Sequence, residues 1–374
     1  MEVTATTHIG LVTQGIVEST VRGLVVLSPA NKRIHRRVLF TNAYGGAVLW
    51  KKVKLGLVPP HHLWGCLELV RMGYEVALAE ALPDFYFNRN ALPHDLRYIS
   101  LIRNWLGSNG VVYCGHNVMY WIPLLKRLGF IRVPVVSLLY AREPLNHSEA
   151  HQGVIALNPA AAEHARKLAP HAKVANLAWG GDLDYFPILP YQAKWLLSCG
   201  ITYRDHRTLA KAAAQSKVPI RLICSPRPAG IDWPTNVDVT DAGRQINIDD
   251  KPVSYEQLLN DYYANAAGSL IITGPDPAHN GACGFTNLIE AMAMGRPVIL
   301  TRTGALATEI DVEKEQCGLH VPAEDPEALA IAMQRLLDNP AEAEAMGQAG
   351  RKLCESRYNI ARYAKELHQF FESL

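Results

Sequence analysis

The sequence predicts an α/β protein made of two doubly wound domains with mostly parallel sheets. Three observations favour this fold class. Apolar runs of strand length alternate with helical segments of about 10–15 residues in both halves of the chain. The runs are continuously apolar, as at residues 133–140, which suits a sheet buried on both faces. A segment with two glycines and two prolines, residues 179–191, interrupts the alternation and marks a domain boundary.

The first half of the chain accounts for one of these domains. Strands are expected at 38–42, 75–79, 111–114, 133–138, 154–157 and 173–177, and helices at 61–72, 95–106, 118–128 and 159–169. In the segment 61–72, Leu63, Leu67 and Val70 form one stripe, and Gly73 is a stop signal. Residues 1–35 contain β-prone pieces without a clear βα unit, so they are assigned only as an N-terminal extension.

The second half repeats the alternation. Strands are expected at 194–199, 220–224, 270–273 and 297–301, and helices at 205–215, 255–266, 287–294, 326–337, 341–355 and 360–371. The predicted organisation is therefore an extension (1–35), a first Rossmann-like domain (36–187), a second (188–357) and a terminal helix (358–374).

Composition places the protein among ordinary globular proteins of the cytoplasm. Apolar residues make up 49% and charged residues 19%, which argues against disorder and coiled coil. No apolar run is long enough to span a bilayer, and the N-terminus lacks the pattern of a signal peptide. Seven cysteines, none in a CxxC pair, argue against a disulfide framework and a cysteine zinc site. We expect Cys283 to be a small buried filler.

Charge is distributed unevenly between the halves. Residues 1–187 carry a net charge of +7 and residues 188–374 a net charge of −5. The basic excess clusters at 32–37 and 51–54 without interleaved aromatic residues, so a nucleic acid is not expected as a partner. Weak peripheral contact with an anionic membrane, a phosphorylated acceptor and a merely solvated surface all stay open.

The strongest local signal is residues 274–301, GPDPAHNGACGFTNLIEAMAMGRPVILT. A strand ends at Gly274, and a loop rich in small residues leads into a helix. Gly281, Gly284 and Thr286 stand just before that helix, where free backbone N–H groups form a site for a diphosphate. The loop is neither a Walker motif nor a GxGxxG fingerprint, which argues against a nucleoside triphosphatase and a nicotinamide enzyme. A tight turn required only for packing is the alternative.

This segment resembles the donor-binding region of retaining glycosyltransferases of family 4 (glycosyl transferases group 1), which have the GT-B fold of two Rossmann-like domains. WGGDLDYF at 179–186 is similar to the segment that closes their first domain. Residues 325–367 resemble their C-terminal helices, the last of which packs back onto the first domain. Before residue 179 the resemblance rests mostly on architecture. Ligands of doubly wound domains bind beyond the carboxyl ends of the strands, so we expect the substrate between loops 44–46 and 115–116 of one domain and loops 202–204 and 280–287 of the other.

The resemblance implies a role for Glu290, which matches the second carboxylate of the family's paired glutamates and would bind the donor ribose hydroxyls. Asn287 lies beside it as a further donor-binding residue. Asn287 and Glu290 also have the spacing of a capping box, which is an alternative role. The first glutamate of the pair falls on Ala282, so another group must replace it; Asp276 and His279 are candidates.

Basic residues and backbone amides are expected on the donor diphosphate. Arg204 occupies the strand–loop–helix where the family places its phosphate-binding residues, and its planar fork suits two phosphate oxygens. Lys211 is a second candidate. The backbone N–H groups of Gly284, Phe285 and Thr286 would hold sugar and phosphate oxygens. Surface exposure without function is the alternative for both basic residues.

The first domain supplies the remaining candidates. Gly45 and Gly46 match the loop after the first strand, where the backbone approaches donor phosphate and acceptor. His116 matches a histidine that the family places near the donor sugar, and we count it with Arg204 as a catalytic candidate. Arg142 and Glu143 follow a strand and would face the acceptor.

The sequence thus predicts a glycosyltransferase that moves a hexosyl group from a UDP- or GDP-sugar to an acceptor hydroxyl. Retention of configuration is implied by the resemblance alone. No cofactor or metal is expected, because the acidic pair Asp249–Asp250 lies in a polar loop and not at a strand end. Arg204 and the helix N-terminus would stabilise the leaving diphosphate instead. A GT-B epimerase or phosphorylase, and a non-catalytic sugar-nucleotide-binding protein, are the alternatives.

Overall fold

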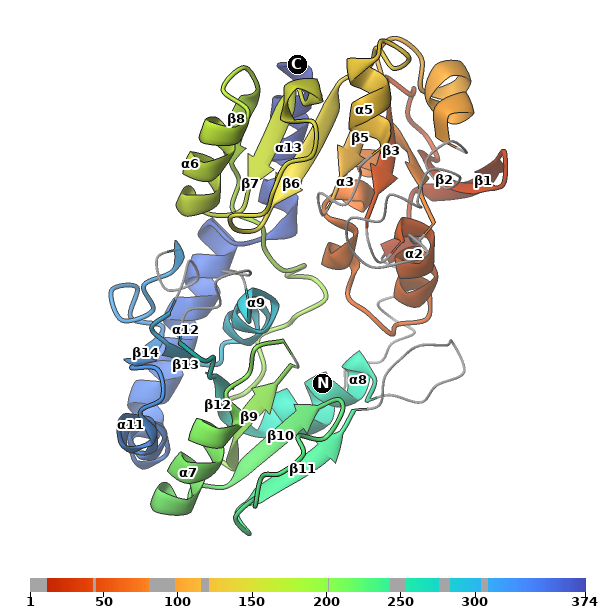
Figure 1. Ribbon diagram of the computed structural model, residues 1–374. Helices are drawn as coiled ribbons and strands as arrows, with labels where there is room; N and C mark the ends of the chain where they lie inside the picture. Colours follow the sequence, from red (N-terminus) through yellow and green to blue (C-terminus); the bar gives the residue numbers. More distant parts are fainter. Residues whose placement is uncertain are drawn as a thin grey trace. The chain divides into compact units, whose positions relative to one another are not determined.

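The computed structural model describes residues 12–42, 45–80, 98–115, 121–200, 202–242, 253–275, 283–303 and 309–374 (Figure 1). The chain forms two compact units. The C-terminal unit is Gly180–Asn359, and the N-terminal unit comprises the described residues up to Trp179 together with Ile360–Leu374. The chain therefore passes between the units twice, at 179/180 and at 359/360. The boundaries expected from the sequence were 187/188 and 357/358.

The N-terminal unit contains one sheet with the strand order β1-β2-β4-β3-β5-β6-β7-β8. The strands are β1 (Ile16–Val21), β2 (Leu24–Pro29), β3 (Arg36–Thr41), β4 (Tyr74–Leu78), β5 (Val111–Cys114), β6 (Val135–Leu139), β7 (Gly153–Ala156) and β8 (Lys173–Asn176). Strands β3 to β8 run parallel, and the continuous apolar runs seen in the sequence lie in them.

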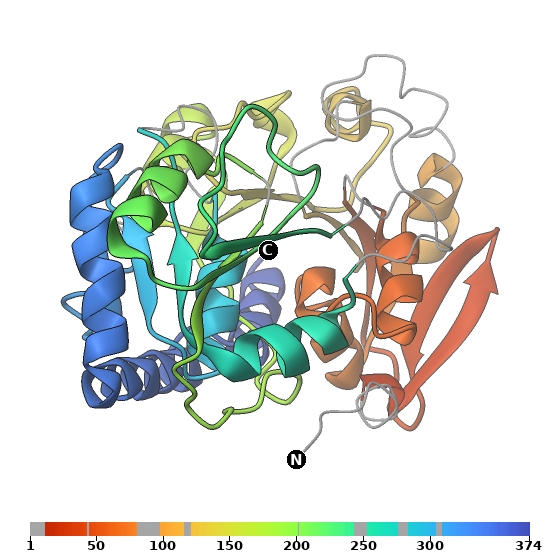
Figure 2. The ribbon, with the colours of Figure 1, turned by 90° about the horizontal axis from the view of Figure 1, so that it is seen from below.

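Strands β1 and β2 form a hairpin at one edge of this sheet (Figure 2). These residues belong to the segment that the sequence left unassigned. Val21 pairs with Leu24, so the connection is a two-residue turn, and both Arg22 and Gly23 have positive φ, 51° and 83°. Such turns favour Asn-Gly or Asp-Gly. With arginine as its first residue, the turn carries a weak sequence signal.

Helices cover both faces of the N-terminal sheet. They are α2 (Gly46–Lys54), η1 (Pro60–Leu63), α3 (Cys66–Arg71), a helical stretch from residue 98 that ends in η3 (Ile102–Leu106), α5 (Trp121–Arg127), η4 (Ser148–Ala150), α6 (Pro159–Leu168) and α13 (Ile360–Glu372). The core on one face joins Leu39 and Val112 of the sheet to Leu101, Ile102 and Ile122. Because strand side chains alternate, the neighbouring positions point to the opposite face.

Helix α13 packs on that opposite face although it comes from the end of the chain. The Tyr113 and Tyr363 hydroxyl groups lie 2.7 Å apart, and the Tyr113 ring packs edge-on against Phe371. Gly153 leaves room for Phe370, since a Cβ there would lie 2.7 Å from the ring. Small residues in the strands therefore admit the aromatic side chains of α13.

The prediction of a single helix over residues 61–72 is wrong. The chain forms η1, then takes a left-handed turn at Trp64 and Gly65 (φ 52° and 82°), and then forms α3. A Cβ at Gly65 would lie 3.4 Å from Tyr363 and Ala364, so this turn also lies against α13. A contact with the far end of the chain leaves no trace in the local apolar pattern.

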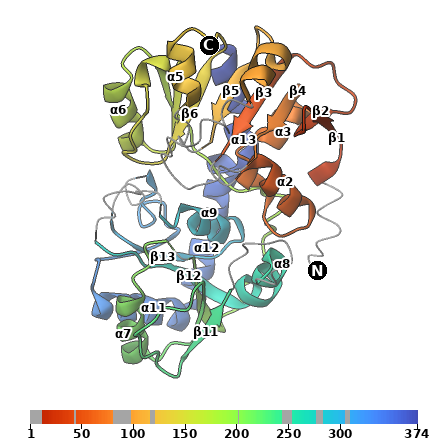
Figure 3. The same cartoon turned by 45° about the vertical axis from the view of Figure 1, so that its right-hand side comes forward.

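The C-terminal unit contains a parallel sheet with the order β11-β10-β9-β12-β13-β14 (Figure 3). Its strands are β9 (Trp195–Cys199), β10 (Ile220–Cys224), β11 (Val237–Asp241), β12 (Ala266–Ile271), β13 (Val298–Thr301) and β14 (Gly318–Val321). Helices α7 (His206–Ser216) and α11 (Pro326–Asp338) share one core, and α9 (Phe285–Ala293) and α12 (Pro340–Ser356) lie on the other face. The predicted α/β class with two doubly wound domains is confirmed.

The helix predicted over 255–266 is divided into short pieces. It begins as α8 (Tyr255–Gln257) behind a capping box formed by Ser254 and Gln257. It continues as a π-helical turn, η5 (Leu258–Tyr262), and a 3₁₀ turn, η6 (Tyr263–Asn265), before β12 starts at Ala266. The sequence therefore places the start of this element correctly but not its internal geometry.

All seven cysteines are buried and free of disulfides. Burial raises the pKa of the Cys283 thiol to about 11, which suits the expected role as a filler. Among the described residues, no helix combines the length and the apolar character needed to cross a membrane.

Candidate functional site

The C-terminal unit has a topological switch point between β9 and β12. The chain moves from β9 outward through β10 to β11 and then returns to the other side of β9 as β12. Ligands of doubly wound sheets bind at the carboxyl ends of such strands. Here the loop after β9 folds across the end of β12, because the Asp205 N–H donates to the Ile272 carbonyl at 2.9 Å.

Arg204 joins this loop to the start of α9. Its Nε donates to the Cys199 carbonyl at 3.1 Å, its Nη1 to the Thr202 carbonyl at 2.9 Å, and its Nη2 to Asn287 Oδ1 at 2.6 Å. A guanidinium has five N–H groups, so these three bonds do not exhaust it. Burial lowers the pKa of Arg204. The result is a cation held at the switch point beside a helix N-terminus.

Two glycines make room for this arrangement. Gly200 has φ +101°, and a Cβ there would lie 2.5 Å from Nη2 of Arg204. Gly284 has φ +91°, and a Cβ there would lie 2.5 Å from the Ile271 side chain. Both positions combine left-handed backbone with a close contact, so they require glycine.

Helix α9 begins at Phe285 with Gly284 as its N-cap, and no side chain caps it. The helix therefore starts two residues before the predicted position 287. The capping box considered for Asn287 and Glu290 is wrong, because the Asn287 side chain binds Arg204 and Glu290 lies beyond the first turn. The backbone amides of the first turn belong to residues 285–287.

Glu290 lies fully buried on α9. Its Oε1 accepts a hydrogen bond from the Tyr255 hydroxyl group at 3.1 Å. Burial raises the pKa of Glu290 to about 8, against the effect of the Tyr255 hydrogen bond. Burial and the nearby Glu290 in turn raise the pKa of Tyr255 well above its usual value. The carboxyl group is therefore largely protonated near neutral pH.

The remaining donor-side candidates are placed differently. Thr286 is half-buried in the first turn of α9, and Phe285 is buried with its ring edge-on to Tyr358. Lys211 is exposed in the second turn of α7. Ala282, Asp276 and His279 lie outside the described residues.

The N-terminal unit has its own switch point, between β3 and β5. Asn42, directly after β3, donates from Nδ2 to the Gly115 carbonyl at 3.0 Å, and the Tyr140 hydroxyl group donates to the same carbonyl at 3.2 Å. Gly45 caps α2 with φ 74°, and a Cβ on Gly46 would lie 3.1 Å from the Phe40 ring. The two glycines therefore place the start of α2 at this end of the sheet. His116 lies outside the described residues.

The loop after β6 carries the two acceptor-side candidates. Glu143 Oε2 accepts from the backbone N–H groups of Tyr140 and Ala141, both at 2.9 Å, so this carboxylate stabilises its own loop. Burial raises the pKa of Glu143 against those hydrogen bonds. Arg142 is exposed. Asn158 donates to the Tyr140 carbonyl at 2.6 Å.

Sequence reasoning missed several polar residues at these strand ends. Asn158 caps α6 by accepting from the Ala161 N–H at 2.8 Å, and its position before Pro159 is a recognisable helix start. Asn42 is the last residue of an expected strand, which is a weaker signal. Tyr255 contacts Glu290 across 35 positions of sequence, and no local pattern indicates this.

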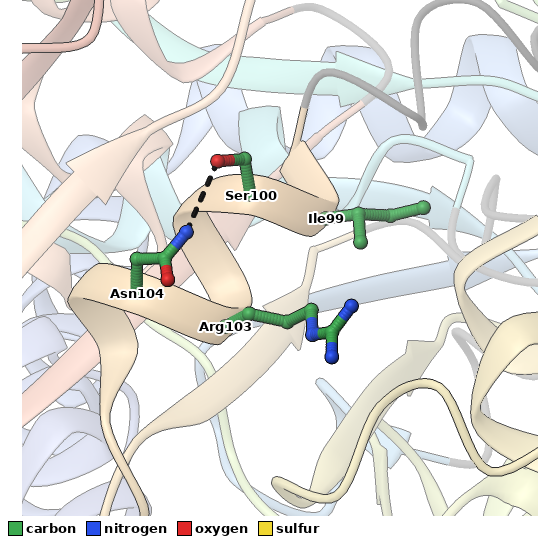
Figure 4. Close-up of a pocket in the computed structure, with 4 residues that line it drawn as sticks. All are labelled: Ile99, Ser100, Arg103 and Asn104. Atoms are coloured by element: carbon green, nitrogen blue, oxygen red, sulfur yellow. Dashed lines mark hydrogen bonds between the residues drawn. The ribbon is translucent and has the colours of Figure 1, made fainter.

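A cavity of about 560 Å³ lies elsewhere in the N-terminal unit, lined by Ile99, Ser100, Arg103 and Asn104 (Figure 4). Asn104 donates to the Ser100 hydroxyl group at 3.2 Å, and the Arg103 side chain extends away from this pair. Among the described residues, none of the site residues predicted from the sequence lines it.

Comparison with known proteins identifies the relatives of this chain. Residues 277–339, which include α9, match the family described as glycosyl transferases group 1. A D-inositol 3-phosphate glycosyltransferase from Corynebacterium urealyticum is 30% identical over 164 residues, 42% of this chain and 36% of that protein. A sucrose-phosphate synthase structure from Thermosynechococcus elongatus has a TM-score of 0.65 at 16% identity, covering 91% of this chain and 99% of the other. The chain has the GT-B fold, and its residues 277–339 resemble the group 1 glycosyltransferases.

Two further comparisons show how much of the chain these likenesses cover. An MMP α-(1→4)-mannosyltransferase from Mycolicibacterium hassiacum is 39% identical over 64 residues, 17% of this chain and 15% of that protein. The Anabaena protein HepE, in complex with UDP and glucose, has a TM-score of 0.59 at 13% identity, covering 91% of this chain and 100% of that one. The GT-B chain thus aligns with solved structures over most of its length, whereas it matches about a third or less of the length of these curated relatives.

Proposed function

We propose that this chain transfers a hexosyl group from a UDP- or GDP-sugar to an acceptor hydroxyl, with retention of configuration and without a metal ion. The observation that carries the proposal is the Arg204–Asn287 hydrogen bond, which holds a guanidinium at the N-terminus of α9. This pair lies at a switch point of the C-terminal sheet, and α9 lies in the segment that matches the group 1 family. The HepE complex with UDP adds support for a nucleotide ligand.

In the proposed reaction, the bond between the anomeric carbon and the diphosphate oxygen breaks, and its electron pair stays on the diphosphate. The acceptor oxygen forms the new bond to the anomeric carbon, and its proton passes to the departing diphosphate oxygen. Negative charge therefore grows on the leaving diphosphate. The Arg204 guanidinium and the backbone N–H groups at the start of α9 would stabilise that charge, which lowers the barrier. His116 is proposed to lie beside the donor sugar.

Glu290 is proposed to bind the ribose of the donor. An ionised carboxylate can accept hydrogen bonds from both vicinal hydroxyl groups. Because burial raises the pKa of Glu290 to about 8, donor binding in this way would displace the proton from this group. Nucleotide binding should therefore release a proton below pH 8.

A panel of UDP- and GDP-sugars tests the function. Arg204→Ala should weaken binding of the free diphosphate nucleotide about ten- to a hundredfold, while binding of the nucleoside changes much less. Arg207→Ala is the matched control, since Arg207 is exposed on the neighbouring helix α7. Transfer or hydrolysis of one donor would support a transferase. Epimerised donor, or turnover only with phosphate, would support the alternative enzymes, and binding without turnover a non-catalytic protein. If Arg204→Ala and Arg207→Ala bound the diphosphate nucleotide with equal affinity, a diphosphate site at Arg204 would be contradicted.

We also propose weak peripheral contact with anionic membranes, through α2. Of the basic residues in the sequence cluster, Arg36 is buried, and Arg37 and Lys54 form ion pairs with glutamates. The exposed face of α2 instead presents Val48, Lys51 and the adjoining Leu55, spaced as one helical stripe. A basic and apolar stripe suits an anionic interface.

Vesicle co-sedimentation at low salt tests this contact. We expect more protein to pellet with anionic than with neutral vesicles, and Lys51→Glu to reduce that excess. Lys173→Glu makes the same charge change at an exposed residue of β8 and serves as control. Equal recovery with both vesicle types, or equal loss in both variants, would show only a solvated surface.

A further inference from the structure

Two histidines and a glutamate from opposite ends of the chain meet on the N-terminal unit. His35 precedes β3, and His368 and Glu372 lie one turn apart on α13. One potential ligand atom from each residue lies within 4.8 Å of the other two. The His35 Nε2 and Glu372 Oε1 atoms are 3.3 Å apart, and these two side chains are 40% and 46% exposed. The three groups are thus close enough to share one small ion and are accessible to it.

Tyr74 supports the arrangement from behind. Its hydroxyl group donates to Glu372 Oε1 at 3.0 Å and lies 2.8 Å from Nδ1 of His368. Because the phenol has a single proton, which goes to the carboxylate, Nδ1 of His368 is the donor to the phenol oxygen. The other ring nitrogen of His368 then keeps its lone pair. Histidine ligands of metals are commonly fixed in this way, by a hydrogen bond to the second ring nitrogen.

The Glu372 carboxylate has two further hydrogen-bonding neighbours. Tyr74 and Arg36 both donate to its Oε1. Arg36 also limits affinity, because its Nη1 lies 3.3 Å from Glu372 Oε1 and competes with a cation for that oxygen. The site therefore suits an ion held mainly by the two imidazoles, with the carboxylate as the third ligand.

We propose that His35, His368 and Glu372 bind a divalent transition-metal ion of the Zn²⁺ type and that this ion joins α13 to the strand β3. Two imidazole nitrogens and one carboxylate oxygen, with water completing the shell, are donors that Zn²⁺ accepts. Ca²⁺ and Mg²⁺ prefer oxygen donors throughout and fit poorly. The ion's role is structural, since His35 lies before β3 and Tyr74 starts β4, at the amino ends of strands whose carboxyl ends carry the candidate site residues.

The test uses the full chain, free of any purification tag and stripped of metal. Titration with ZnCl₂ should show a saturable site that His35→Ala and His368→Ala each weaken at least tenfold. Tyr74→Phe keeps the ring and removes the hydroxyl group, so it should weaken binding less than loss of a ligand does. His171→Ala removes an exposed histidine elsewhere and should leave the affinity unchanged.

Melting curves provide a second readout. Zn²⁺ should raise the melting temperature of the wild type and of His171→Ala but not that of His35→Ala, while MgCl₂ should have no such effect. Melting of the metal-free variants shows that each has folded. Zn²⁺ affinities of His35→Ala and His368→Ala equal to that of the wild type would overturn the proposal, as would the absence of any saturable site in the folded wild type.

Discussion

Burial gives the Glu290 carboxyl group a pKa of about 8, where an exposed glutamate has 4.5. Between these two values the folded state holds a proton that the unfolded state has lost. The free energy of unfolding contributed by this group therefore falls as the pH rises from about 4.5 to about 8 and is constant beyond. The buried acid thus makes the empty protein less stable toward alkaline pH.

Glu290→Gln should remove this dependence, because an amide of the same shape does not titrate. The melting temperature of the variant should exceed that of the wild type by an amount that grows from pH 4.5 to 8, equivalent to roughly 5 kcal/mol. Tyr255→Phe removes the hydrogen bond that lowers the pKa of Glu290, so the pH range over which stability falls should extend to higher pH. Parallel melting profiles for wild type and Glu290→Gln would mean that the group does not titrate in this range.

Asn287 offers a test in which stability and affinity change in opposite directions. Its Oδ1 accepts from Arg204 at 2.6 Å, in the first turn of α9. Asn287→Asp turns this bond into an ion pair and puts a negative charge at a helix N-terminus, so stability should rise by about 1 kcal/mol. The same charge opposes a diphosphate, and nucleotide affinity should fall about tenfold. Calorimetry gives the nucleotide affinity of Asn287→Asp, and melting curves give its stability. Unchanged or tighter nucleotide binding would contradict a diphosphate at Arg204.

At the scale of elements, the sequence predicted most strands of both sheets to within a few residues. Buried parallel strands such as β6 are continuously apolar, and that signal is local. Strands β11 and β14 were missed, and both lie at an edge of the sheet. Strand β11 is rich in polar residues (VDVTD at Val237–Asp241), and β14 (Gly318–Val321) is only 4 residues long. The helix break at Trp64 and Gly65 depends on α13, some three hundred residues away, and lies beyond any local pattern.

Helix α12 illustrates how one close approach can reverse an intrinsic preference. A Cβ on Gly347 would lie 2.0 Å from the Gly295 carbonyl oxygen, so the helix backbone touches the turn after α9. Gly→Ala inside a helix usually stabilises by about 1 kcal/mol. Here Gly347→Ala should instead destabilise by about 2–3 kcal/mol, because the backbone cannot yield as a side chain would. Gln348→Ala, at an exposed neighbouring position, should be nearly neutral. A higher melting temperature for Gly347→Ala would show that the two segments can separate freely.

For the whole molecule, the sequence predicted the two doubly wound domains and the helix that carries the candidate donor residues. It could not predict that Arg204 binds Asn287, since that contact depends on how the loop after β9 folds over β12. The basic cluster at residues 32–37 also contributes less exposed charge than the sequence suggested. Arg36 is buried and donates to the Phe371 carbonyl and to Glu372, so it stabilises α13 and contributes no open charge.

The proposed metal independence concerns the whole molecule and can be tested beside the proposed zinc site. If Arg204 and the α9 amides supply the charge that the diphosphate needs, transfer should proceed at an unchanged rate in excess EDTA at a temperature well below melting. The same treatment should lower the melting temperature if the purified protein holds Zn²⁺ at His35 and His368. The transfer rate in EDTA therefore reports on a catalytic ion, and the melting temperature in EDTA reports on a structural ion. A rate lost in EDTA and restored by Mg²⁺ would refute the metal-free mechanism, because Mg²⁺ does not suit the histidine site and binds diphosphates readily.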